Sequence, residues 1–157
     1  MKNLLSIYQT DPYLYQIDLT ANWIDKLSFS LIQPRECNLD TFLKMIYMIL
    51  KTHNYYEFSN EFKSVNFELN CEQFRILILD ITPSDVATVL KQIRIKSGYS
   101  LEQLARLTGF SKSSISHRES FTTLTFPNLK TIQKYLDSCN LTFLQFIVLV
   151  ALKVLIR

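Results

Sequence analysis

Two short helical patterns separated by a glycine form the clearest arrangement of apolar and polar positions in the chain. In the first, small or apolar side chains recur at i, i+3, i+4 and i+7, as on one face of a helix: Leu101, Leu104, Ala105 and Thr108. Ser100 is the expected N-cap of this helix, and Gly109 fits the tight turn after it. Ser111 then caps a second helix from Lys112 to about Glu119. The pattern predicts two helices joined by a sharp turn.

Further helices are expected on both sides of this pair. The segment 82–85, Thr-Pro-Ser-Asp, is a capping box with proline at the first helical position. Residues 127–129, Pro-Asn-Leu, open another helix, and Asn140 stands at its left-handed C-terminal cap position. Thr142 caps the last helix. Residues 82 to about 149 therefore fit one five-helix unit.

The C-terminal segment 143–156 is almost wholly apolar, with interruptions only at Gln145 and Lys153. A membrane span needs about 20 residues, so we expect a buried helix rather than a membrane helix. It could pack between the helical unit and the N-terminal half, or against its twin in a dimer.

The N-terminal half carries mixed patterns. Alternation predicts two half-buried strands, the first through Leu27, Phe29 and Leu31 and the second through Val65, Phe67 and Leu69. The run Phe74–Leu79 fits a strand buried on both faces, and Leu39–His53 fits a helix capped by Asn38 or Asp40. The predicted fold class is α+β, with a small α+β domain over residues 1–81 followed by an all-α five-helix domain over residues 82–157.

The two halves carry opposite charge. Residues 1–81 contain seven Lys/Arg against ten Asp/Glu, a net charge of −3, whereas residues 82–157 contain ten against four, a net charge of +6. A duplex carries about one negative charge per 1.7 Å of its axis, so a positive module gains affinity by releasing counterions. The alternative is that scattered cations only keep a small helical domain in solution.

Neither the cysteines nor the histidines suggest catalysis or a metal site. Cys37, Cys71 and Cys139 lack metal-ligand spacing, so we expect reduced thiols in a cytoplasmic protein without a cofactor. His53 and His117 have no nucleophile or carboxylate at a telling distance, so we expect no enzyme. The first five residues are too briefly apolar for a signal peptide.

Spacing and residue types in segments 99–119 and 127–132 resemble the helix-turn-helix of the Cro/C1-type family, the xenobiotic-response-element family of bacterial and phage regulators. The resemblance implies that the second helix enters the major groove of DNA. Its outward polar positions are the candidates for reading base edges: Lys112, Ser113, Ser116 and His117. Side chains at helix starts or beside this helix are the candidates for phosphate contacts: Ser100, Arg118, Thr122, Thr123 and Lys130.

Three positions differ from the family pattern. Leu101 stands where the family commonly has a glutamine that touches phosphate, Arg118 where an apolar residue is usual, and Phe121 where a glycine often ends the second helix. In the following loop, Leu124 and Phe126 either pack against the domain, which we favour, or form an apolar contact surface for another chain.

The sequence thus predicts a dimeric, sequence-specific DNA-binding regulator, a repressor that binds an inverted repeat of double-stranded DNA. An alternative is a protein-binding inhibitor, such as an antitoxin or a phage-borne anti-defence protein. In it, residues 1–81 would bind a protein target and the helix-turn-helix would regulate the protein's own promoter. A third interpretation is a motif that has lost DNA binding and binds only protein. The expected partners are double-stranded DNA, a second copy of the chain and, under the alternative, a protein bound by residues 1–81, with no membrane.

Overall fold

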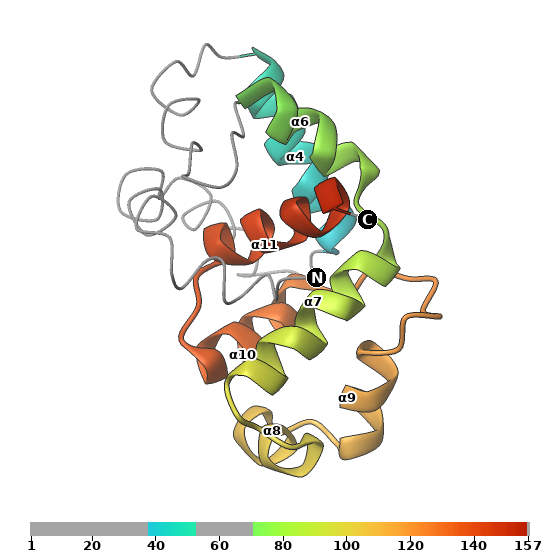
Figure 1. Cartoon of the computed structure of the whole chain (residues 1–157), viewed down its shortest axis with the longest axis vertical. Helices are drawn as coiled ribbons and strands as arrows, with labels where there is room; N and C mark the ends of the chain where they lie inside the picture. The colour runs from blue at the N-terminus through green and yellow to red at the C-terminus, as the bar shows by residue number, and fades with distance from the viewer. Residues whose placement is uncertain (1–37, 53–70, 157) are drawn as a thin grey trace.

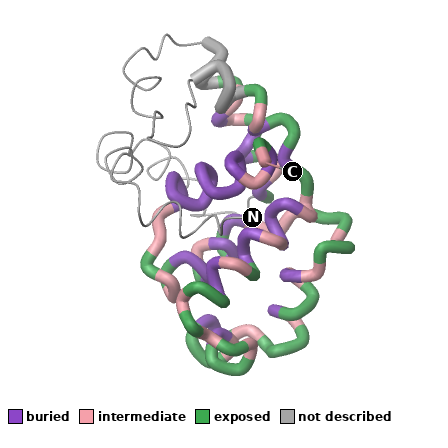
Figure 2. Tube along the Cα trace, viewed as in Figure 1, coloured by how far each residue is buried: buried purple, intermediate pink, exposed green. Residues whose placement is uncertain are grey.

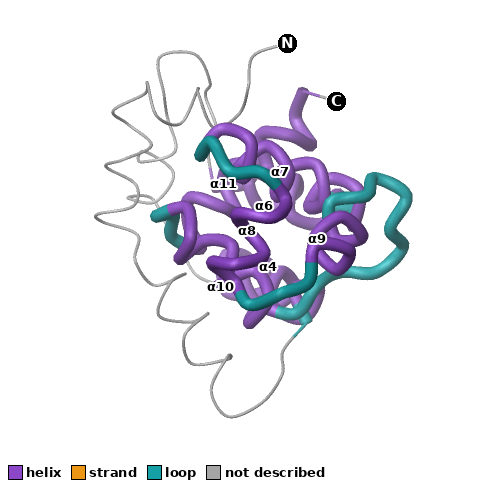
Figure 3. Tube along the Cα trace, turned by 90° about the horizontal axis from the view of Figure 1, so that it is seen from below, coloured by secondary structure: helices purple, strands orange, loops and turns teal. Residues whose placement is uncertain are grey.

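The computed structural model describes residues 38–52 and 71–156, and within these ranges every regular element is a helix (Figures 1 and 3). The helices are α4 (Leu39–Thr52), α6 (Cys71–Asp80), α7 (Pro83–Lys96), α8 (Leu101–Thr108), α9 (Lys112–Arg118), α10 (Leu129–Cys139) and α11 (Phe143–Ile156). The β-pairing among the described residues is a single isolated bridge between Asn38 and Asn128. The prediction of an α+β fold class is therefore wrong for this part of the chain.

The error is clearest at the run Phe74–Leu79, which was predicted as a strand and forms most of α6. A short apolar run does not distinguish a strand from a buried helix, and leucine is a good helix former. Ile78 is buried, whereas Ile76 and Leu79 are each more than half exposed, so one helical face packs and the other faces outward. The strands expected at residues 27–31 and 65–69 lie outside the described residues.

The helix predicted at Leu39–His53 is confirmed as α4, which the structure describes to Thr52. Asn38 caps it, because its Oδ1 accepts a hydrogen bond from the backbone N–H of Asp40 at 2.7 Å. The same residue donates from Nδ2 to the carbonyl of Phe126 at 3.1 Å, and the backbone N–H of Leu39 donates to the carbonyl of Pro127 at 3.0 Å. The start of α4 is thereby tied to the segment that leads into α10.

The apolar C-terminal helix α11 lies at the centre of the molecule (Figures 1 and 2). Every residue from Phe143 to Leu152 is buried, and α11 packs against α6, α7 and α10. Phe143 also meets Phe42 of α4 edge to face, with ring centroids 5.8 Å apart. The described contacts thus match the first of the two expected arrangements, with α11 between the five-helix unit and helices of the N-terminal half.

The predicted division of the chain at residues 81 and 82 falls between α6 and α7. As a domain boundary it stays a prediction. Side chains from both sides of it, including Ile78 and Val86, belong to one buried apolar cluster.

Helix ends in the C-terminal half follow the predicted capping chemistry. Thr82 and Asp85 form the capping box of α7, and Asn128 caps α10. Asn140 adopts the left-handed conformation at φ 57°, and Thr142 Oγ1 accepts the backbone N–H of Gln145 at 3.1 Å at the start of α11. These caps satisfy backbone groups that a helix end otherwise leaves unpaired.

In the described part of the chain, no single helix is long and apolar enough to cross a bilayer. Only α10 and α11 taken together meet that test of length and composition, and they are bent by 100° at the break between them.

Candidate nucleic-acid interface

Helices α8 and α9 form the predicted pair with a sharp turn between them. Ser100 and Gln103 make a reciprocal capping box at the start of α8, with contacts of 3.1 and 2.8 Å. Gly109 ends that helix at φ 80°, a left-handed conformation that costs an L-residue energy and glycine little. Ser111 caps α9 by accepting the backbone N–H of Ser114 at 3.1 Å. Leu104 and Ile115 close the joint with fully buried side chains.

A buried ion pair fixes the C-terminal end of α9. Glu119 caps α9, and its carboxylate accepts Arg94 Nε at 3.0 Å from each oxygen; the Nη2 of Arg94 lies 2.9 Å from Oε1. Arg94 also donates to the carbonyl of Tyr99 at 2.9 Å, and the Tyr135 hydroxyl donates to Glu119 at 3.3 Å. The pair joins α7, α9 and α10, so the orientation of α9 is set by the core and not by its own seven residues.

The four predicted base-reading side chains are all exposed on α9. Lys112 lies 3.1 Å from Glu102 of α8 in an ion pair whose side chains are both more than half exposed. Such a pair contributes little stability, so the ammonium group can exchange this partner for another acceptor. The hydroxyl of Ser113 lies 3.2 Å from that of Ser111.

The predicted phosphate contacts surround this helix. Ser100, Thr122 and Lys130 are exposed, and Thr123 is half-buried. The hydroxyl of Thr122 lies 2.8 Å from that of Ser120, and the backbone N–H of Thr123 donates to the carbonyl of Ser120 at 3.1 Å, which closes a turn directly after α9. Hydroxyl groups and lysines in these positions can donate to phosphate oxygens.

Arg118 is held differently from the other candidates. Its guanidinium carbon lies 5.2 Å from the centroid of the Phe110 ring, and Lys134 Nζ of α10 lies 5.0 Å from the same centroid. The Nε of Arg118 is buried and has no hydrogen-bond partner among the described residues. Cation–π contact therefore accounts for an arginine where the family usually has an apolar residue. Leu101, the other departure within the helices, packs half-buried against the core.

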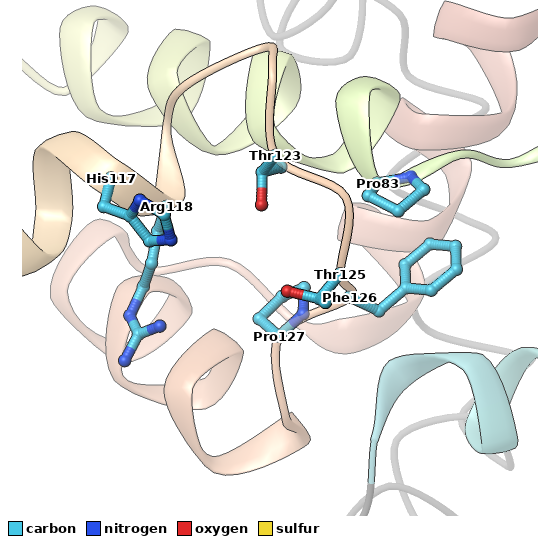
Figure 4. Close-up of a pocket in the computed structure, with 7 residues that line it drawn as sticks. All are labelled: Pro83, His117, Arg118, Thr123, Thr125, Phe126 and Pro127. Carbon is cyan, nitrogen blue, oxygen red and sulfur yellow. The ribbon is translucent and has the colours of Figure 1, made fainter.

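A pocket of about 70 Å³ lies between the end of α9, the following loop and the start of α7 (Figure 4). The hydroxyl groups of Thr123 and Thr125 point into the space that His117 borders, while the guanidinium of Arg118 points away from it. Pro83 and Phe126 close its apolar side. The pocket thus brings together three predicted contact residues, His117, Arg118 and Thr123, and adds Thr125, which was not predicted from the sequence.

Thr125 and the Arg94–Glu119 pair escaped prediction because both depend on how distant segments meet. The hydroxyl-rich stretch Ser-Phe-Thr-Thr-Leu-Thr at 120–125 was the available signal for the first. For the second, two opposite charges 25 residues apart carry no signal in one sequence.

The two apolar residues of the loop after α9, Leu124 and Phe126, differ in exposure although the sequence suggested one role for both. Phe126 packs partly buried against the core, as we favoured, whereas Leu124 is 91% exposed. Phe121 is 73% exposed. These two side chains follow the predicted reading helix and are left largely uncovered by the described part of the chain.

The segment that contains α9 is rich in positive charge. In residues 103–136 the only acidic residue is Glu119, which is buried against Arg94, while five cations occupy the same segment: Arg106, Lys112, Arg118, Lys130 and Lys134. The nearest exposed carboxylate before the segment, Glu102, is the partner of Lys112. The face that holds α9 therefore favours a polyanion.

Two groups near α9, the Tyr135 hydroxyl and the Cys139 thiol, are kept neutral by burial. Burial, reinforced by the neighbouring Glu119, raises the pKa of Tyr135 well above its ordinary value. Burial also raises the pKa of the free Cys139 thiol. Among the described residues no three His, Cys, Asp or Glu side chains are grouped as metal ligands would be.

Comparison with known proteins agrees with this geometry. Residues 90–144 match the family model described as Helix-turn-helix, which represents Cro/C1-type domains, and the match covers α8, α9 and α10 in full. Neither a curated protein nor a solved structure matches the chain. The family match supports a DNA-binding regulator in general terms.

Proposed function

Because residues 90–144 form a Cro/C1-type helix-turn-helix, we propose that this protein is a sequence-specific transcription repressor that binds an inverted repeat as a homodimer. The observation that carries the proposal is the exposed polar face of α9. It is held in a fixed orientation by the Arg94–Glu119 pair, in a segment, residues 103–136, whose other charged side chains are positive. A major-groove helix needs both properties, since side chains read base edges only when phosphate contacts hold the register.

In the proposed mechanism, Lys112, Ser113, Ser116 and His117 face the bases. Lys112 is the candidate for a guanine, whose O6 and N7 accept hydrogen bonds in the major groove. Ser100, Thr122, Thr123, Lys130 and Arg118 hold the phosphates. Two copies related by a two-fold axis would place their α9 helices one DNA turn apart, about 34 Å, and occupancy of a promoter would exclude polymerase.

A selectivity measurement tests the assignment of Lys112. We expect Lys112→Ala to weaken binding by about 1 to 3 kcal/mol and to relax base preference at one position of the site. Lys130→Ala should instead weaken binding to all sequences alike and reduce the salt slope by about one. The matched control is Lys44→Ala on α4, which removes the same charge from a side chain 70% exposed and paired with Asp40.

Competitive binding of base-substituted duplexes, measured by fluorescence anisotropy at two salt concentrations, reads out all three variants. Unchanged base preference in Lys112→Ala would refute the reading role. Equal losses in Lys112→Ala and Lys44→Ala would show that net charge, not position, governs binding.

A further inference from the structure

The loop between α9 and α10 displays two large apolar side chains that the helical body does not cover. Phe121 is 73% exposed and Leu124 is 91% exposed, more than any other large apolar side chain among the described residues. Figure 3 shows this loop at the edge of the molecule, next to α9. A single exposed apolar side chain needs no explanation, but two large ones on one short loop beside a predicted DNA-reading helix call for one.

The loop is fixed at both ends. Its first residue follows Glu119, which Arg94 and Tyr135 hold in the core. Its far end is held by α4, through the contacts of Asn38 and Leu39 with the carbonyls of Phe126 and Pro127. The exposed side chains therefore project from an ordered support, and a partner would not need to order the loop on binding.

The chemistry around the two side chains favours DNA as the partner. Hydroxyl groups alternate with them along the loop, at Ser120, Thr122, Thr123 and Thr125. From Ser120 to Leu136 the chain has no acidic residue, and Lys130 and Lys134 are exposed on α10 just beyond the loop. A second copy meeting this loop would bring the same positive charge, whereas a duplex brings the opposite charge.

We propose that this loop is a second DNA-contacting element, in which the hydroxyl groups hold the backbone and Phe121 and Leu124 make apolar contact with the bases flanking the site read by α9. Apolar side chains contact thymine methyl groups in the major groove and insert between base steps from the minor groove. The inference rests on the proposed function and adds the part of the site that lies outside the recognition helix.

The variants Leu124→Ser and Phe121→Ser test the contact in the full chain. The matched control is Leu79→Ser, which is 56% exposed and belongs to α6, outside both α9 and the loop that follows it. The probes are two duplexes obtained with the wild-type protein by selection from a random-sequence library, one containing the full repeat and one a single half-site with its flanks. Unfolding temperature is measured for each variant, and exposure predicts no change in it.

We expect Leu124→Ser and Phe121→Ser each to weaken binding about tenfold, since each loses the burial of an apolar side chain in the complex. This loss applies to the half-site, and on the full repeat, where both copies lose the contact, it should be about a hundredfold. The slope of log K against log salt should stay unchanged, because no phosphate contact is removed. Leu79→Ser should bind as the wild type does.

Wild-type affinity in both loop variants would overturn the inference while leaving the proposed function intact. A loss confined to the full repeat would also overturn it, because it would assign the loop to contact between protein copies. Selection that enriches no duplex would refute the proposed function itself, and this inference with it.

Discussion

Replacing the buried Arg94–Glu119 pair, one partner at a time and then together, tests how the fold holds α9. The two side chains are only 10% and 3% exposed. In Arg94→Met the carboxylate stays buried with the Tyr135 hydroxyl as its remaining described donor, and in Glu119→Leu the guanidinium keeps only the Tyr99 carbonyl. Leaving one charge of a buried pair unpaired costs about 3 to 5 kcal/mol of unfolding free energy. Since a domain of this size has about 5 to 15 kcal/mol in total, each single variant should lose much of its stability.

The double variant Arg94→Met/Glu119→Leu removes both buried charges of the pair. It leaves only the Tyr135 hydroxyl and the Tyr99 carbonyl short of a partner, at about 1 to 3 kcal/mol each. We therefore expect the double variant to lose no more stability than either single variant, although additivity would predict twice the loss. The control is Lys44→Ala, which breaks an exposed pair and should cost under about 1 kcal/mol.

Urea unfolding followed by circular dichroism measures these differences, and Glu119→Gln provides a milder variant if either single replacement prevents folding. DNA affinity should fall in the single variants as well, because Glu119 caps α9. The role given to the pair would be refuted if the single variants lost no more unfolding free energy than Lys44→Ala. It would also be refuted if the loss in the double variant equalled the sum of the two single losses.

Three further predictions concern the turn and the neutral buried groups. Gly109→Ala should lower the unfolding free energy by about 1 to 2 kcal/mol through backbone strain alone, because an added Cβ would meet nothing within 4 Å. Urea unfolding measures this loss, and an unchanged unfolding free energy would contradict it. The raised pKa of Tyr135 means that the unfolded chain ionises first, so stability should fall as pH rises above about 10, by up to about 1.4 kcal/mol per pH unit. Tyr135→Phe should not show this part of the loss of stability at alkaline pH. Equal slopes of unfolding free energy against pH in the two proteins would contradict the assignment. In a Cys37→Ser/Cys71→Ser protein, the remaining Cys139 thiol should react with a disulfide reagent more slowly in the native state than in urea, because burial raises its pKa; equal rates would show that it is not protected.

Local chemistry explains why the C-terminal half was predictable from the sequence. Each cap is formed by residues three or four positions apart, as in Ser100 with Gln103 or Thr142 with Gln145, so the sequence contains both partners of each contact. The left-handed positions at Gly109 and Asn140 are likewise properties of single residues.

What the sequence could not provide depends on packing between distant segments. The run at α6 became a helix because α4 and α11 cover one of its faces, and its apolar residues alone fit a strand equally well. The exposure of Leu124 depends on α4 holding the end of the loop, a contact made 88 residues away along the chain by Asn38. Of the candidate site, the residues on α9 followed from helical spacing, whereas the pocket beside His117 and the ion pair behind it required the fold.

Fluorescence-anisotropy titration of the full chain tests the central claim most directly. The probes are the DNA upstream of the protein's own gene and a scrambled duplex of equal length, each at low and at physiological salt. The proposal predicts binding to the upstream DNA at least about a thousandfold tighter than to the scrambled duplex, and retention of that preference at physiological salt. Equal affinity for both duplexes, abolished by salt, would contradict sequence-specific recognition by α9.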